Sequence, residues 1–280
     1  MKQDSGTTSQ LAQDASAQQA FASYARPLIG EAIELVEAVH QDPSPEALHE
    51  LRVSLRRLRS LWWAFAPLLD EGENARQRAV YQFLASAAGK TRDWDILIEL
   101  LARHSGVREL IPRLEEARGE TLAVSRQTLL NADVKHLLRD AFTRTTAELN
   151  TAHAPRIALR QFAFKRVSAS KRSMKKRVKR ASRAKRSDYA AFHDVRKAGK
   201  KLRYLFEFFG PVLKGGQKRT LKRLKRIQKC FGELNDTVAS EALLRDNAAL
   251  LAGAGDFDGA LQWLDKERKR HLRVVAGLLR

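Results

Sequence analysis

Two short segments of the chain each place one histidine and three cationic residues at helical spacing. At about 100° per residue, each set covers only about 80° of a helix circumference, so its side chains point the same way. Guanidinium groups bind phosphate oxygens through paired hydrogen bonds, lysine adds a point charge, and histidine donates one or two hydrogen bonds. These residue types at this spacing predict the binding of an anion. The first stripe consists of His49, Arg52, Arg56 and Arg59, and the second stripe of His193, Arg196, Lys200 and Arg203.

The surroundings of the stripes favour a ligand over a plain solvated surface. Leu51, Leu58 and Phe65 fall on the face opposite the first stripe, where they are expected to pack into a core. Like charges three or four residues apart repel by roughly 0.2–0.5 kcal/mol per pair, and no acidic residue lies on either stripe. The alternative is the solvated cationic face of an amphipathic helix. Because the pattern occurs twice, with a histidine at the same end, an anionic ligand explains it better.

The two segments belong to an internal repeat. Residues 49–69 and 193–213 align without a gap over 21 positions, eight of which are identical. Further along, Gly89-Lys-Thr-Arg-Asp93 parallels Gly232-Glu-Leu-Asn-Asp236. A repeat of this length predicts a duplicated helical unit, divided near residues 153–155.

Further cations extend the expected anion site. Two of them directly adjoin the stripes, and four lie in a helix expected after residue 216. This secondary set consists of Arg57, Lys201, Lys222, Lys225, Arg226 and Lys229.

Residues 165–186 carry a dense run of lysine and arginine with a weaker apolar face. A helix would place Val167, Met174 and Val178 together, opposite the charges. The same composition is also typical of a disordered basic linker. The sequence leaves both interpretations open, and in either case we expect these charges on an outer surface.

The charge balance points to a polyanionic partner. The 280 residues include 52 Lys and Arg against 32 Asp and Glu, a formal net charge of +20. Residues 165–229 hold 25 basic and 3 acidic residues, so this segment carries the whole imbalance. A polyanion is the class of partner that such a segment attracts.

Several other classes of site are not supported. Cys230 is the only cysteine, which excludes an intramolecular disulfide and a zinc site built from cysteines. A P-loop would need glycine where Leu84 stands, and a zinc-protease helix would need histidine in place of Val53. Asp93 and Asp95 are better explained as residues at a helix start than as metal ligands. We therefore expect no catalytic residues, no metal and no cofactor.

The periodicity predicts an all-α fold. Apolar residues recur at helical spacing throughout, and Gly- and Pro-containing breaks divide the chain into about ten helices. We expect a disordered polar tail over 1–15, a first helical bundle over 16–152 and a second over 153–280. No apolar run is long enough to cross a membrane, and the first twenty residues do not resemble a signal peptide, so a cytoplasmic protein is expected. The aromatic residues expected in the core are Trp62, Trp63, Phe206, Phe208 and Phe209.

The paired blocks His-x-x-Arg-x-x-x-Arg-Arg-Leu-Arg (49–59) and His-x-x-Arg-x-x-x-Lys-Lys-Leu-Arg-Tyr (193–204) resemble the CHAD family, the conserved histidine α-helical domain. The segments 89–95 and 232–236 also resemble its secondary motifs. The resemblance implies two pseudo-symmetric four-helix bundles, with a basic groove or pore between them that binds inorganic polyphosphate, and association with polyphosphate granules. Many members follow a triphosphate-tunnel catalytic domain marked by Glu-x-Glu-x-Lys. That triplet is not found here, so a stand-alone member is expected. Gly199 stands mid-helix, and a close helix approach would explain it.

Together these observations predict a non-enzymatic protein that binds inorganic polyphosphate through its two stripes. Two alternatives remain: a nucleic-acid-binding protein that uses 165–229 as an electrostatic patch, and an accessory subunit of a phosphate-metabolising enzyme. No aromatic residue lies between Phe164 and Tyr189 to stack on bases, which disfavours the first alternative.

Overall fold

The computed structural model describes residues 15–42, 44–151, 155–185, 188–213, 215, 217–249, 251 and 257–279. Within these ranges the chain forms ten α-helices and three short 3-10 helices, with no β-strand beyond an isolated bridge between Ser16 and Ala158. The predicted all-α fold is confirmed. The elements are α2 (Ala17–Gln41), α3 (Pro45–Phe65), η1 (Ala66–Leu68), α4 (Glu71–Ala87), α5 (Lys90–Leu101), η2 (Ser105–Leu110), α6 (Ile111–Asn131), α7 (Val134–Thr151), α8 (Leu159–Ala181), α9 (Tyr189–Phe209), η3 (Gly210–Val212), α10 (Lys218–Asp246) and α11 (Phe257–Leu278).

Side-chain caps fix where the two helices that carry the stripes begin. The hydroxyl oxygen of Ser44 accepts a hydrogen bond from the backbone N–H three residues on, at 3.2 Å, and α3 starts there. A carboxylate oxygen of Asp188 does the same for α9 at 3.1 Å. Each cap satisfies an N–H that helix geometry leaves free. His49 and His193 consequently occupy the same place, in the second turn of their helices.

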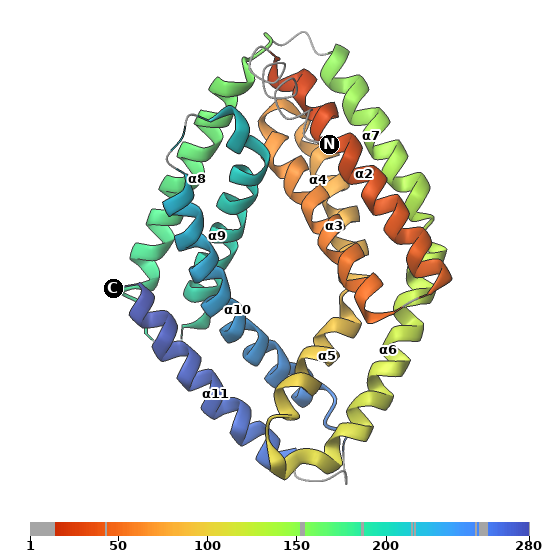
Figure 1. Cartoon of the computed structure of the whole chain (residues 1–280), viewed down its shortest axis with the longest axis vertical. Helices are drawn as coiled ribbons and strands as arrows, with labels where there is room; N and C mark the ends of the chain where they lie inside the picture. Colours follow the sequence, from red (N-terminus) through yellow and green to blue (C-terminus); the bar gives the residue numbers. More distant parts are fainter. Residues whose placement is uncertain are drawn as a thin grey trace, which may run out of the picture.

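The helices form a four-sided frame (Figure 1). The upper right side consists of α2, α3, α4 and α7, and the upper left side contains α8 and α9. The lower right side consists of α5 and α6, and the lower left side contains α11. The long helix α10 begins beside α8 and α9 and continues into the lower left side. The two stripe-bearing helices, α3 and α9, therefore belong to facing sides of the frame.

Two apolar clusters close the frame at its upper and lower corners. In the upper cluster, the ring centroid of Phe65 on α3 lies 5.4 Å from that of Phe162 on α8 and 5.6 Å from that of Phe209 on α9. In the lower cluster, Leu97 of α5 and Leu244 of α10 are completely buried together. Each such side chain contributes about 1.5–3 kcal/mol on burial. These clusters hold the facing sides together in spite of their like charge.

The two halves are alike around the stripes and differ beyond them. α3 and α9 each contain 21 residues, and each is followed by a three-residue 3-10 helix. Gly89 then separates α4 from α5, whereas Gly232 lies inside the continuous helix α10. The lower apolar cluster also combines α5 and α6 with α10 and α11. The duplication of two whole four-helix bundles therefore stays a prediction.

The expected division of the chain falls between helices. α7 ends at Thr151 and α8 begins at Leu159, while residues 152–154 lie outside the described residues. The expected tail over 1–15 also lies outside them, except for Ala15. Among the described helices, none has the length and apolar character needed to cross a membrane.

The basic segment is helical. α8 extends to Ala181 and buries Val167 and Met174 against the core, which excludes the linker interpretation for residues 165–181. Gly199 of α9 lies opposite α8 and α10, but a Cβ there would be 3.8 Å from the Met174 Cε atom, an ordinary contact. A close helix approach, as expected from the sequence, is therefore not the reason for this glycine.

Candidate anion-binding site

A cavity of about 680 Å³ lies between α3, α4 and α5 on one side and α9 and α10 on the other. Its volume falls in the range of small-molecule sites. Nine cationic and two acidic side chains line this main cavity, a formal net charge of +7 with histidine neutral. The cations are Arg52, Arg56, Arg59, Arg78, Arg92, Arg196, Lys197, Lys200 and Lys201, and the acids are Asp93 and Asp236.

Half of the fourteen residues predicted from the sequence line this cavity. α3 contributes four of them and α9 three, so both stripes meet in one place. The residues brought together are His49, Arg52, Arg56, Arg59, Arg196, Lys200 and Lys201.

Three predicted residues on α3 and α9 lie outside the cavity wall. The Arg57 guanidinium instead pairs with the Glu31 carboxylate of α2 at 3.1 Å. Arg203 pairs with Glu207 one turn along its own helix, at 3.0 Å. His193 lies next to the Tyr189 hydroxyl, at 3.4 Å from its Nδ1 atom. The two stripes are therefore not equivalent, since only the first contributes its histidine and its last arginine.

The four predicted cations of α10 also lie outside the wall, and all four side chains are exposed. α10 buries Leu224, Ile227 and Phe231 in the core, and this packing sets its rotation about the helix axis. Its contribution to the cavity comes further along, from Asn235 to Ser240. The structure thus places Lys222, Lys225, Arg226 and Lys229 outside this cavity, and their part in anion binding stays a prediction.

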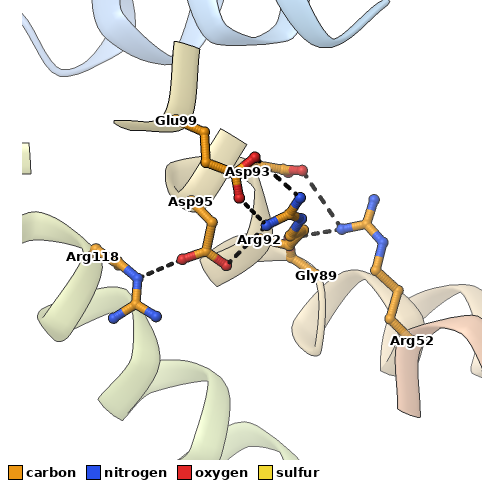
Figure 2. A network of polar contacts seen from close by, with 7 residues as sticks. All are labelled: Arg52, Gly89, Arg92, Asp93, Asp95, Glu99 and Arg118. Carbon is orange, nitrogen blue, oxygen red and sulfur yellow. Dashed lines mark hydrogen bonds and ion pairs between the residues drawn. The ribbon is translucent and has the colours of Figure 1, made fainter. Parts of the chain in front are cut away.

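Arg52 is held in place by the protein itself (Figure 2). Its guanidinium donates a hydrogen bond to the Gly89 carbonyl at 2.7 Å and lies 3.5 Å from the Asp93 carboxylate. A Cβ at Gly89 would lie 1.8 Å from the Arg52 Nη1 atom, so this approach requires glycine. Burial raises the pKa of Asp93, although Arg52 acts in the opposite direction. Arg52 is thus positioned before any ligand arrives.

Arg92 belongs to the same polar network but has different partners. It pairs with Glu99 at 2.8 Å and approaches Asp95 at 3.9 Å, while Arg118 of α6 binds the other oxygen of Asp95. Two of the nine cations, Arg52 and Arg92, are therefore partly neutralised by α5 itself.

Six other cations of the wall have no carboxylate oxygen within 4.0 Å among the described residues: Arg56, Arg59, Arg78, Arg196, Lys200 and Lys201. The buried Nε atoms of Arg78 and Arg196 also lack a hydrogen-bond partner there. A buried, unpaired donor on a charged group costs several kcal/mol unless a ligand binds it. Such donors facing one cavity are suited to a multivalent anion.

Burial and mutual repulsion change the ionisation of these groups. Burial lowers the pKa of Arg59, Arg78 and Arg196. Burial, with the charges of Arg56 and Arg196, lowers the pKa of Lys200 to about 6. The Lys200 amine is therefore mainly neutral at pH 7 while the cavity is empty.

Both histidines are neutral under the same conditions. Burial lowers the pKa of His49, and Arg92 and Arg52 lower it further. Burial and Lys197 do the same for His193. Only His49 faces the cavity, so it alone can donate to a ligand there.

Three cations of the wall, Arg78, Arg92 and Lys197, were not predicted as site residues from the sequence. Arg78 stands 144 positions before Lys222, the offset that aligns the stripes, but Lys222 lies outside the wall, so the repeat does not identify Arg78 as a site residue. Arg92 occupies a motif whose charges were explained as helix-start residues. For Lys197, next to Arg196 in the sequence, we find no signal.

The prediction that Trp63 belongs to the core is wrong. Trp62, Phe206, Phe208 and Phe209 are buried as predicted, but Trp63 is only half-buried and lines the cavity. The Lys201 amine lies 5.0 Å from the centre of its ring system, within cation–π range.

The described residues contain no group of three His, Cys, Asp or Glu side chains that could hold a metal ion.

Known proteins with this fold support the architecture. The family model of the CHAD domain matches residues 23–245. A crystal structure of the CHAD domain from the plant Ricinus communis superposes with a TM-score of 0.81 at 24% identity, covering 95% of this chain and 92% of that one. PptA from Streptomyces chartreusis superposes with a TM-score of 0.64 at 16% identity, covering 95% and 98%. At these identities the likeness concerns the fold. No curated protein matches the chain.

Proposed function

We propose that this chain, which belongs to the CHAD domain family, binds inorganic polyphosphate in the main cavity and does not change it chemically. The observation that carries the proposal is the wall itself, in which nine cationic side chains face two carboxylates. A like-charged wall of this kind is costly when empty and is stabilised when a polyanion binds.

Polyphosphate suits the donors of this wall. It carries negative charge on every unit and has no base edges, so it needs many phosphate contacts and no sequence readout. Arginine forks on rigid helices provide such contacts, each worth about 1.5–3 kcal/mol when charge-assisted. Arg56 and Arg196 come from facing helices, so one chain can contact both sides of the frame. Association with polyphosphate granules is part of this proposal.

The rival ligand is nucleic acid. The exposed cations of α8 offer it an electrostatic surface. Such contacts weaken strongly with salt, whereas donors inside a cavity are screened less. Salt dependence therefore distinguishes the two ligands.

The test is a titration of long-chain polyphosphate and of single- and double-stranded DNA, matched in phosphate concentration, at several salt concentrations. We expect polyphosphate to bind more tightly and to keep its affinity at salt concentrations that abolish DNA binding. DNA binding as tight as polyphosphate binding at every salt concentration, or no polyphosphate binding, would refute the proposal.

A pair of double variants, each removing two positive charges, tests the site within the same assay. Arg56→Gln with Arg196→Gln removes two cations from the cavity wall. Arg172→Gln with Lys175→Gln removes two exposed cations of α8. We expect the first variant to lose about a hundredfold or more in polyphosphate affinity at moderate salt, from two contacts of about 1.5–3 kcal/mol, and the second to lose far less. Equal losses would mean that net charge alone determines binding.

A further inference from the structure

A second pocket, of about 360 Å³, lies directly beside the main cavity, between α8 and α9. The two spaces share three wall residues, Trp63, Lys197 and Lys201. The remaining cations of the second pocket, Arg166 and Arg177, come from α8. Its wall therefore combines the edge of the main cavity with the basic helix.

The shared residues form a border that is cationic on both sides. Lys197 and Lys201 lie one helical turn apart on α9, and Trp63 lies opposite them on α3. Burial lowers the pKa of Lys201, and the charges of Arg78 in the main cavity and Arg177 in the second pocket lower it further. An anion on either side of this border therefore faces the same positive charge.

Arg166 is a fixed part of the second pocket. Its guanidinium donates hydrogen bonds to the backbone carbonyls of Trp63 at 2.7 Å and Ala64 at 2.8 Å, and it lies 4.8 Å from the centre of the Trp63 ring system. Both carbonyls lie in the last turn of α3, and the Trp63 carbonyl also accepts a hydrogen bond from the Ala66 N–H. Arg166 thus supports the fold, which makes it a poor choice for a binding test.

Arg177 is the available cation of the pocket. Among the described residues its guanidinium makes hydrogen bonds only with Ser173, on its own helix, and it forms no ion pair. The single carboxylate in the wall, Asp194, pairs with Lys197 at 3.1 Å. Four cations against one acid give this pocket a formal net charge of +3.

We propose that the second pocket is a further subsite for polyphosphate, continuous with the main cavity, and that it takes the part of a long chain that the cavity cannot hold. The chain crosses α9 at Lys197 and Lys201, and Arg177 then binds its phosphate oxygens. This inference rests on the proposed function. It also gives a role to the inward-facing arginines of α8, which we had expected on an outer surface.

The test compares tripolyphosphate, which is short enough for one site, with long-chain polyphosphate. The variant is Arg177→Gln, and its matched control is Arg172→Gln, an exposed arginine of the same helix that lines neither space. We expect Arg177→Gln to lower affinity for the long chain about tenfold or more and to change tripolyphosphate affinity less than about twofold. The control should change both affinities less than about twofold at moderate salt.

Two outcomes overturn the second subsite. One is an equal loss of long-chain affinity in Arg177→Gln and Arg172→Gln. The other is an equal loss of both ligands in Arg177→Gln, which would assign Arg177 to the main site. A different result would refute the proposed function itself: the double variant of Arg56 and Arg196 would then bind both ligands as tightly as the wild type. The thermal unfolding midpoint of each variant, measured in parallel, shows that it is folded.

Discussion

Binding of a polyanion in the main cavity should be accompanied by uptake of a proton at Lys200. The pKa of this amine is lowered to about 6 by burial and by the neighbouring arginines, so the amine is neutral at about pH 8 in the empty cavity. Phosphate oxygens beside the amine favour its charged form and raise the pKa again. The complex therefore holds more protons than the free protein, and falling pH favours its formation.

The lowered pKa of Lys200 determines how strongly the affinity for polyphosphate depends on pH. At about pH 8, protonating a group with a pKa of about 6 costs about 2.7 kcal/mol, a factor of about one hundred in affinity. Water in the open cavity screens part of this cost, so we expect affinity to rise roughly ten- to a hundredfold as the pH falls from about 8 to about 6. Below that pH, Lys200 is already charged in the free protein and its contribution levels off.

Isothermal titration calorimetry in buffers of different ionisation enthalpy counts the protons taken up. With long-chain polyphosphate at about pH 8, the wild type should take up about one proton through Lys200. Lys200→Arg keeps the charge without the titration, so it should lose this uptake and bind more tightly at that pH. If Lys200→Arg takes up as many protons as the wild type, the reasoning about Lys200 is wrong.

Three further outcomes are expected. His49→Ala should remove a smaller part of the pH dependence, because His49 faces the cavity with a lowered pKa, whereas His193→Ala should leave the pH dependence of binding unchanged. Gly89→Ala should lower the free energy of unfolding by about 1–3 kcal/mol, because the added Cβ displaces Arg52. Gly232→Ala lies inside α10 with free space around it, so it should raise the free energy of unfolding by up to about 1 kcal/mol. Denaturant unfolding measures both changes. Long-chain polyphosphate should raise the thermal unfolding midpoint well beyond chloride of equal ionic strength, and equal midpoints would contradict a site between the facing helices.

The sequence best predicted the residues of the site on helices whose apolar packing face and charged face are both evident from the residue spacing. Periodicity and the internal repeat together predicted that Arg56 and Lys200, 144 positions apart, hold equivalent positions on two anion-binding stripes. The family resemblance implied that the stripes share one groove, and both residues line the cavity. The pairing of Arg203 with Glu207 was also open to prediction, because the two stand four residues apart on one helix.

Contacts between helices determine the position of the charged residues that the sequence did not assign correctly. The pairing of Arg57 with Glu31 depends on how α3 lies against α2, which no local pattern encodes. Arg78 reaches the cavity because α4 packs beside α3, and Lys222 does not because the apolar face of α10 turns its charges to solvent. Helix rotation is fixed by tertiary packing, so charge patterns alone could not assign these residues.

The closed frame also imposes an order on folding. Its upper and lower clusters join helices that are far apart in the chain, such as α3 with α9 and α5 with α10, and contacts of this kind form slowly because a long loop must close first. Until the frame closes, the cations of α3 and α9 are separated and solvated, so their repulsion opposes only this last step. A multivalent anion in the refolding mixture should therefore accelerate the slow phase and leave the formation of the individual helices unaffected. By neutralising the cations that later bind it, the ligand would thus promote the folding step that forms its binding site.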